Sequence, residues 1–170
     1  MYHEAFAQMK KLLGQLDKWL DTAVAHAKSR SFDPNLFLGF RLAPDQFAFA
    51  RQVQVACDTA KLAASRLTGK DAQTQADTEQ TIDELKARIA KTLAHVKSLD
   101  RAKIDAAADR EITFPLGPVN KGSMKGDDYL THFVLPNFYF HLTAAYAILR
   151  HAGVEVGKRD FLGQIPMKMT

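Results

Sequence analysis

Apolar residues recur at intervals of three and four along four long stretches of this chain, a periodicity typical of amphipathic helices. The spacing predicts helices over residues 3–28, from 44 or 45 to 67 or 68, from 77 to 100, and from 127 or 128 to 152. Each apolar stripe needs a partner that buries it. The sequence therefore predicts an all-α fold in which these segments pack as a four-helix bundle.

Turn and cap residues between the stretches support these boundaries. Gly69 follows the second stretch as a left-handed cap, and Asp77 with Gln80 has capping-box spacing at the start of the third. Pro136 interrupts the fourth stretch, where its missing N–H predicts a kink just before Asn137. The segment EITFPLGPVNKGSMKG, residues 111–126, alternates apolar residues with Gly and Pro, which predicts a short β-hairpin-like insert before the last helix.

The remaining segments are rich in apolar residues and are expected to fold against the helices. Residues 31–43 predict a loop across one end of the bundle, although their aromatic side chains could instead cover a partner. The tail, residues 157–170, is expected to fold back through Phe161, Leu162 and Ile165, and Trp19 is expected to pack inside. A chain of 170 residues suits one core, so we expect a single domain over residues 1–170.

Composition excludes several classes of protein. No apolar run reaches the length of a membrane span, which predicts a soluble, cytoplasmic protein. The net charge is +4, but basic residues are dispersed among acidic ones without a nucleic-acid motif, so nucleic-acid binding is not expected. Cys57 is the sole cysteine, expected as a buried thiol in a reducing compartment, with a reactive thiol as the alternative.

A polar pair on the last predicted helix is the candidate functional site. His141 lies on its apolar face, and Asn137 precedes it by one turn. The imidazole either bonds a facing side chain, for which Gln52, Gln54 and Asp58 are candidates, or binds a metal ion. No two histidines are three or four residues apart, so a metal site would need ligands from distant helices.

Three segments carry a resemblance to a known group of proteins: LAPDQFAFARQVQVACDTAKLAASRL, DTEQTIDELKARIAKTL and PNFYFHLTAAYAILRHAGVEVGKRDFLG. In this order they resemble a family of domains of unknown function related to the DinB/YfiT-like four-helix bundles, and the resemblance covers nearly the whole chain. That superfamily includes metal-dependent thiol transferases and maleylpyruvate isomerase-like enzymes with three histidines at one site. It implies an up-down-down-up helix order. Residues 69–76, however, span only about 27 Å when extended. This is short for crossing the length of a helix, so an arrangement in which consecutive helices run antiparallel is a second possibility.

The resemblance also identifies the positions of the expected metal ligands. His141 matches the second of two histidines four residues apart on the last helix, and Asn137 stands where the first is expected. The second helix offers no histidine in the corresponding region, where the candidates are Gln52, Gln54, Cys57 and Asp58. One of three ligands is therefore present, and amide oxygens are poor ligands for zinc or nickel.

Three functional hypotheses follow. The first is a small-molecule-binding protein, as a homodimer, without the full metal site and with a polar pocket around His141, Asn137 and Gln54. The alternative is a transferase or hydrolase in which His141, with Asp58 or Cys57, holds a divalent metal such as zinc or nickel. The third is an interaction module that uses the aromatic loop 32–40 and the tail. The sequence leaves open whether the protein is an enzyme.

Overall fold

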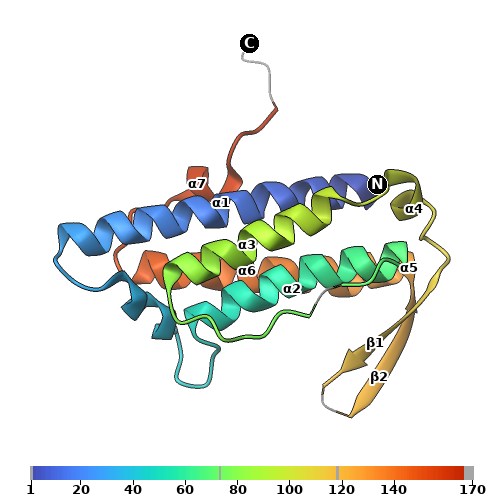
Figure 1. Cartoon of the computed structure of the whole chain (residues 1–170), viewed down its shortest axis with the longest axis horizontal. Coiled ribbons are helices and arrows are strands. Elements are labelled where there is room, and N and C mark those ends of the chain that lie inside the picture. Colours follow the sequence, from blue (N-terminus) through green and yellow to red (C-terminus); the bar gives the residue numbers. More distant parts are fainter. Residues whose placement is uncertain (1, 73, 118, 167–170) are drawn as a thin grey trace.

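Four long helices lie side by side around one core in the computed structural model, which describes residues 2–72, 74–117 and 119–166 (Figure 1). They are α1 (Tyr2–Ser29), α2 (Phe49–Thr68), α3 (Ile82–Lys97) and α6 (Leu135–His151). The shorter elements are η1 (Pro34–Gly39), α4 (Arg101–Asp105), β1 (Glu111–Leu116), β2 (Asn120–Lys125), α5 (Gly126–Asp128), η2 (Tyr129–Val134) and α7 (Lys158–Leu162). The predicted mostly helical fold, with a small antiparallel sheet before the last helices, is confirmed.

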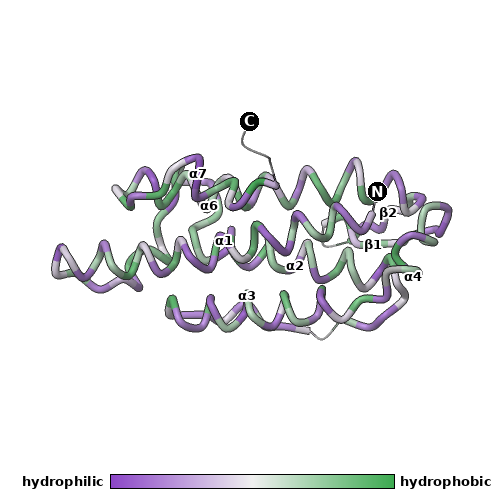
Figure 2. The backbone as a smooth tube through the Cα atoms, turned by 90° about the horizontal axis from the view of Figure 1, so that it is seen from above, coloured by the Kyte–Doolittle hydropathy of each residue, from purple (hydrophilic) through white to green (hydrophobic). Residues whose placement is uncertain are grey.

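Each long helix buries one face, and apolar and polar residues alternate along the helices in Figure 2. Among the described residues, none of the helices has the length and apolar character needed to cross a membrane.

The helices follow the up-down-down-up order. Pairs between α2 and α3 advance in the same direction, from Asp58 with Arg88 (2.8 Å) to Ser65 with His95 (2.9 Å), so these helices are parallel. Pairs between α2 and the last helical segment advance in opposite directions, so α2 and α6 are antiparallel. These pairs are Gln52 with His141, Thr59 with Asn137, and Arg66 with Tyr129.

The connection before α3 is longer than the sequence suggested, because the predicted capping box at Asp77 and Gln80 is wrong. The box consists of Thr81 and Glu84: the Thr81 hydroxyl accepts from the Glu84 N–H (3.2 Å), and the Glu84 carboxylate accepts from the Thr81 N–H (3.0 Å). Residues 69–81 therefore form the connection, and they reach roughly 43 Å at full extension. The helix α2 that they pass is about 30 Å long.

Helix α2 begins at Phe49, later than predicted, because residues 40–48 form a loop closed by a hydrogen bond from the Phe49 N–H to the Phe40 carbonyl (2.8 Å). The preceding segment η1 covers an end of the helices, as predicted, and Phe37 is fully buried there. This arrangement leaves Phe47 in the loop, beside the first turn of α2.

The hairpin β1–β2 extends from the helices and is fixed to them by Phe114, whose ring packs on Tyr129 (4.8 Å between centroids) and Phe133 (4.6 Å) (Figure 1). Both aromatic partners belong to η2, a π-helical segment in which the Leu135 N–H bonds the Leu130 carbonyl. This wider turn stands immediately before Pro136, where the sequence predicted a kink.

The C-terminal segment returns to α1. Phe161 of α7 stacks on Trp19 at 5.5 Å, and the Trp19 indole donates to the Asp160 carbonyl (3.1 Å). Trp19 is buried and Leu162 partly buried, but Ile165 is 45% exposed, so its predicted packing is wrong. The end of the predicted tail, residues 167–170, lies outside the described residues.

Candidate functional site

His141 of α6 and Gln52 of α2 form a buried hydrogen-bonded pair. His141 Nδ1 lies 2.7 Å from Gln52 Oε1, and the Gln52 amide nitrogen donates to the Phe47 carbonyl (3.1 Å). Because that nitrogen is already a donor, the Gln52 oxygen faces the imidazole and must accept from Nδ1. In the neutral ring the proton is therefore assigned to Nδ1, and Nε2 is an acceptor.

The surroundings of His141 keep its ring neutral. Burial, together with the positive charge of Arg51, lowers the pKa of His141 below its ordinary value of 6.5. Phe47 stacks on the ring at 6.2 Å, and Phe140 meets it edge-on at 5.1 Å. Within the described part of the chain Nε2 has no hydrogen-bond partner, so the site offers one open acceptor at neutral pH.

Asn137 lies one turn earlier on α6 and contacts a different residue of α2. Its amide nitrogen donates to the Thr59 hydroxyl (2.7 Å), and that hydroxyl donates to the Val55 carbonyl (2.7 Å). The Asn137 side chain is thereby held in one orientation. Its carbonyl oxygen has no protein partner among the described residues and is available to a ligand.

A groove of about 210 Å³ lies beside this pair, where α2, the η2–α6 segment and the hairpin meet. We call it the α2–α6 groove. It is lined by Arg51, Val55, Asp58, Thr59, Leu62, Arg66, Pro115, Tyr129, Phe133 and Asn137. Arg51 also lies over the Phe47 ring (5.7 Å) and is the charge that acts on His141, so it connects the groove with the imidazole.

Arg66 places a positive charge at the hairpin end of the groove. Its guanidinium donates to the Tyr129 hydroxyl (2.8 Å) and lies 5.9 Å from the ring centroids of both Phe114 and Tyr129. Burial raises the pKa of Tyr129 although Arg66 opposes the shift, so this hydroxyl stays protonated at neutral pH. No carboxylate of the described residues lies within ion-pair distance of Arg66, whereas Arg51 is paired with Asp77.

Gln54 and Asp58 take part in a separate network centred on Arg88 of α3. Arg88 is only 2% exposed, and its guanidinium contacts three carboxylates, those of Asp58 (2.8 Å), Asp77 (2.9 Å) and Glu79 (2.9 Å). Lys61 pairs with Asp58 (2.8 Å), and Gln54 donates to Glu79 (2.8 Å). This network fastens the connection before α3 to both helices, and each of its three carboxylates is paired with a cation of the protein.

Cys57 is fully buried in the core, beside Thr92 of α3. Burial raises the pKa of its thiol to about 12. The sulfur is therefore a buried, protonated thiol at neutral pH.

The donors around His141 do not fit the metal site that the resemblance implies. Among the described residues, no three His, Cys, Asp or Glu side chains cluster as a metal site requires. Gln52 accepts from His141 Nδ1, and Arg88 and Lys61 hold the Asp58 carboxylate. The structure thus brings Gln52 to His141 and places Asn137 one turn away, while Gln54, Asp58 and Cys57 make contacts elsewhere.

Sequence reasoning missed Thr59, Arg66 and Tyr129. A signal for two of them was present, because Gln52, Thr59 and Arg66 are spaced seven apart and so share one face of α2. That face is the one that meets α6. Tyr129 had no such signal, since its position depends on the π-helical turn.

Comparison with known proteins agrees with this fold. A crystal structure of a DinB family member protein from Shewanella denitrificans matches with a TM-score of 0.89 and 41% sequence identity, over 97% of this chain and 93% of that one. No curated protein matches the sequence. The fold is therefore that of a DinB-like helical protein. Residues 1–162 match the domain of unknown function DUF1993, and the chain belongs to that family.

Proposed function

We propose that this protein, as a DinB-like four-helix bundle, binds a small organic anion in the α2–α6 groove. The observation that carries the proposal is the guanidinium of Arg66, which borders the groove without a carboxylate partner among the described residues. A cation in such a position favours an anionic ligand, and guanidinium matches the planar geometry of a carboxylate.

The walls of the groove indicate what the rest of the ligand is like. Leu62, Pro115 and Phe133 supply apolar surface, and the Asn137 carbonyl supplies one hydrogen-bond acceptor. Ligand sites combine apolar walls with a few fixed polar groups in this way. With a volume of about 210 Å³ the groove suits a compact carboxylate with an aromatic or aliphatic body.

Binding is favoured over metal-dependent transfer or hydrolysis by the arrangement of donors. Either Asp58 or Cys57 would have to complete a site with His141, but the Asp58 carboxylate is paired with Arg88 and Lys61, and the Cys57 thiol is fully buried in the core. We expect protein purified without chelator or metal-affinity tag to carry well below one zinc, nickel or manganese ion per chain. One ion per chain retained through dialysis would instead support the metal-dependent transferase or hydrolase.

Benzoate and its uncharged analogue benzamide provide a test of the anion site. We expect benzoate to shift the amide resonances of α2 and η2 saturably in ¹H–¹⁵N spectra, and benzamide to bind at least about tenfold more weakly. The variant Arg66→Met keeps the apolar stem but removes the charge, and benzoate binding should fall toward that of benzamide.

Arg30→Met is the matched control, because Arg30 is an exposed arginine outside the groove. It should leave benzoate binding unchanged. Equal binding of benzoate and benzamide, or equal losses in the two arginine variants, would contradict an anion site at Arg66.

A further inference from the structure

Gly14 lies near the middle of α1, where glycine has no packing role. A glycine in a helix interior costs about 1 kcal/mol relative to alanine. A Cβ at Gly14 would meet no atom within 4 Å, and the residue is not among the glycines with positive φ. Neither close packing nor backbone geometry therefore accounts for it, and its effect is to leave a hollow on the surface of α1.

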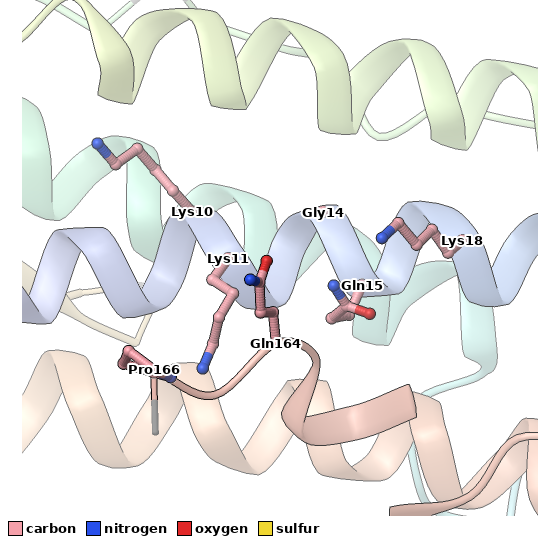
Figure 3. A pocket seen from close by; sticks show the side chains of 7 residues that line it. All are labelled: Lys10, Lys11, Gly14, Gln15, Lys18, Gln164 and Pro166. Atoms are coloured by element: carbon pink, nitrogen blue, oxygen red, sulfur yellow. The ribbon is translucent and has the colours of Figure 1, made fainter. Parts of the chain in front are cut away.

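This hollow, the α1 hollow, has a volume of about 490 Å³. Figure 3 shows Lys11 extending toward the C-terminal segment, with Gln15 and Lys18 on the other side of Gly14. The complete lining is Lys10, Lys11, Gly14, Gln15, Lys18, Gln164 and Pro166. Figure 3 shows the Lys10 side chain extending away from Gly14, so the ammonium groups of Lys11 and Lys18 and the amides of Gln15 and Gln164 are the polar groups closest to the space. The lining contains no acidic residue.

The positive charge of the α1 hollow is not neutralised by its neighbours. Asp17 and Asp21 also belong to α1, but they contact Lys86 of α3 at 3.2 and 2.6 Å. None of the three lysines of the hollow has an ion pair within the described residues. These two acids thus pair with α3, while Lys10, Lys11 and Lys18 remain available to an external anion.

The second wall of the hollow has a defined position. Gly163 has φ +62°, and a Cβ there would lie 2.8 Å from Gln15, so only glycine lets the chain turn this close to α1. The stack of Phe161 on Trp19 (5.5 Å) holds the segment just before this turn. The C-terminal segment therefore forms a wall of the hollow in a fixed position, and the hollow is not open to solvent on every side.

We propose that the α1 hollow binds a small molecule that carries several phosphate groups. Separate ammonium groups bind phosphate oxygens as point charges, and the two amides add donors between them. A volume of 490 Å³ is within the range of small-molecule sites. A free polyphosphate compound and the headgroup of a phosphoinositide share this chemistry, and the site is distinct from the α2–α6 groove.

Two variants separate the charge of the hollow from its shape. Lys11→Gln with Lys18→Gln removes two charges, whereas Gly14→Leu fills the space, leaves the charge unchanged and favours the helix. Lys97→Gln with Lys121→Gln is the matched control, since it removes the same charge from two exposed lysines outside the hollow. The probes are inorganic triphosphate, followed by calorimetry, and phosphatidylcholine vesicles containing phosphatidylinositol bisphosphate, followed by co-sedimentation.

We expect saturable binding that falls at least about tenfold in the lysine variant and in Gly14→Leu, and stays within about twofold in the control. The melting temperature of Gly14→Leu should not fall. If that variant fails to fold, the lysine variant and its control decide. Binding of triphosphate would identify the ligand as a free polyphosphate compound. Binding of the vesicles alone, if it is lost in the same variants, would identify the ligand as a phosphoinositide headgroup. Equal losses in the control, unchanged binding by folded Gly14→Leu, or no saturable binding to either probe would overturn the proposal.

Discussion

His141 Nδ1 lies 2.7 Å from Gln52 Oε1, and the direction of this hydrogen bond is set by the second bond that Gln52 makes, to the Phe47 carbonyl. The amide can accept from the ring only while its nitrogen donates to that carbonyl. One loop carbonyl thus decides which nitrogen of the imidazole carries the proton. The free nitrogen, Nε2, is the one available to a ligand.

We predict the Nδ1–H tautomer for His141 at neutral pH, observable in long-range ¹H–¹⁵N spectra of the ring. In Gln52→Glu a carboxylate would face Nδ1 and stabilise the charged ring, so the pKa of His141 should rise by about one unit or more. An Nε2–H tautomer in the wild type, or an unchanged pKa in Gln52→Glu, would contradict the assigned hydrogen bond.

The lowered pKa of His141 also predicts a pH dependence of stability. Below about pH 6.5 the unfolded chain binds a proton that folded His141 resists, so this residue makes the free energy of unfolding fall as pH falls. His141→Gln should reduce that fall between pH 7 and 5, measured by urea unfolding. Leu142→Ala, a destabilising change at a buried residue that does not titrate, should keep the wild-type pH dependence.

The sequence predicted the faces of the helices better than the pairing between them. Placing His141 and Asn137 on the inner face of the last helix required only the periodicity of one helix. The partner of Asn137 was missed, because the offset between α2 and α6 depends on where each helix begins. Gln52 was among the three partners considered for His141, and only the structure could choose between them.

The third helix shows why local patterns did not fix the helix order. Two successive pairs, Asp77 with Gln80 and Thr81 with Glu84, both fit a capping box, and nothing local distinguishes them. Asp77 instead contacts Arg51 and Arg88, which are distant in sequence. Those contacts lengthen the connection and permit α2 and α3 to run parallel, and Asp58 contacts Arg88 of α3 instead of His141.

The network around Arg88 should contribute strongly to stability. Arg88→Met would leave three carboxylates near one another without their buried counter-charge. We expect the free energy of unfolding to fall by about 3 kcal/mol. This value is at the lower end for a broken buried ion pair, because the carboxylates are partly exposed. The matched control is Lys86→Met on the same helix, whose more exposed pairs with Asp17 and Asp21 should cost less than about 1 kcal/mol. Equal effects in urea unfolding would contradict the central role of Arg88.

Cys57 should be inert in the folded protein. The thiol is fully buried, and burial raises its pKa to about 12, so neither accessibility nor the thiolate form supports reaction at pH 8. We expect no reaction with Ellman's reagent over the time in which a free thiol reacts completely, and one equivalent per chain after unfolding in guanidinium. Rapid reaction of the native protein would contradict this prediction and support the alternative that Cys57 is a reactive thiol.

Gly126 is the first residue of α5, between the hairpin and η2, at a point where a side chain has no room. A Cβ at this position would lie 2.0 Å from the Ala107 carbonyl oxygen, a backbone atom that cannot move without displacing the turn after α4. Gly126→Ala should therefore lower the free energy of unfolding by about 1–3 kcal/mol or more, through overpacking. Gly39→Ala is the matched control, because a Cβ there meets nothing within 4 Å, and its effect should stay within about 0.5 kcal/mol.

Gly126→Ala should also affect the α2–α6 groove, because Phe114 and Tyr129 pack together across this junction. We expect this variant to shift the amide resonances of η2 and to weaken benzoate binding. Gly39→Ala should do neither.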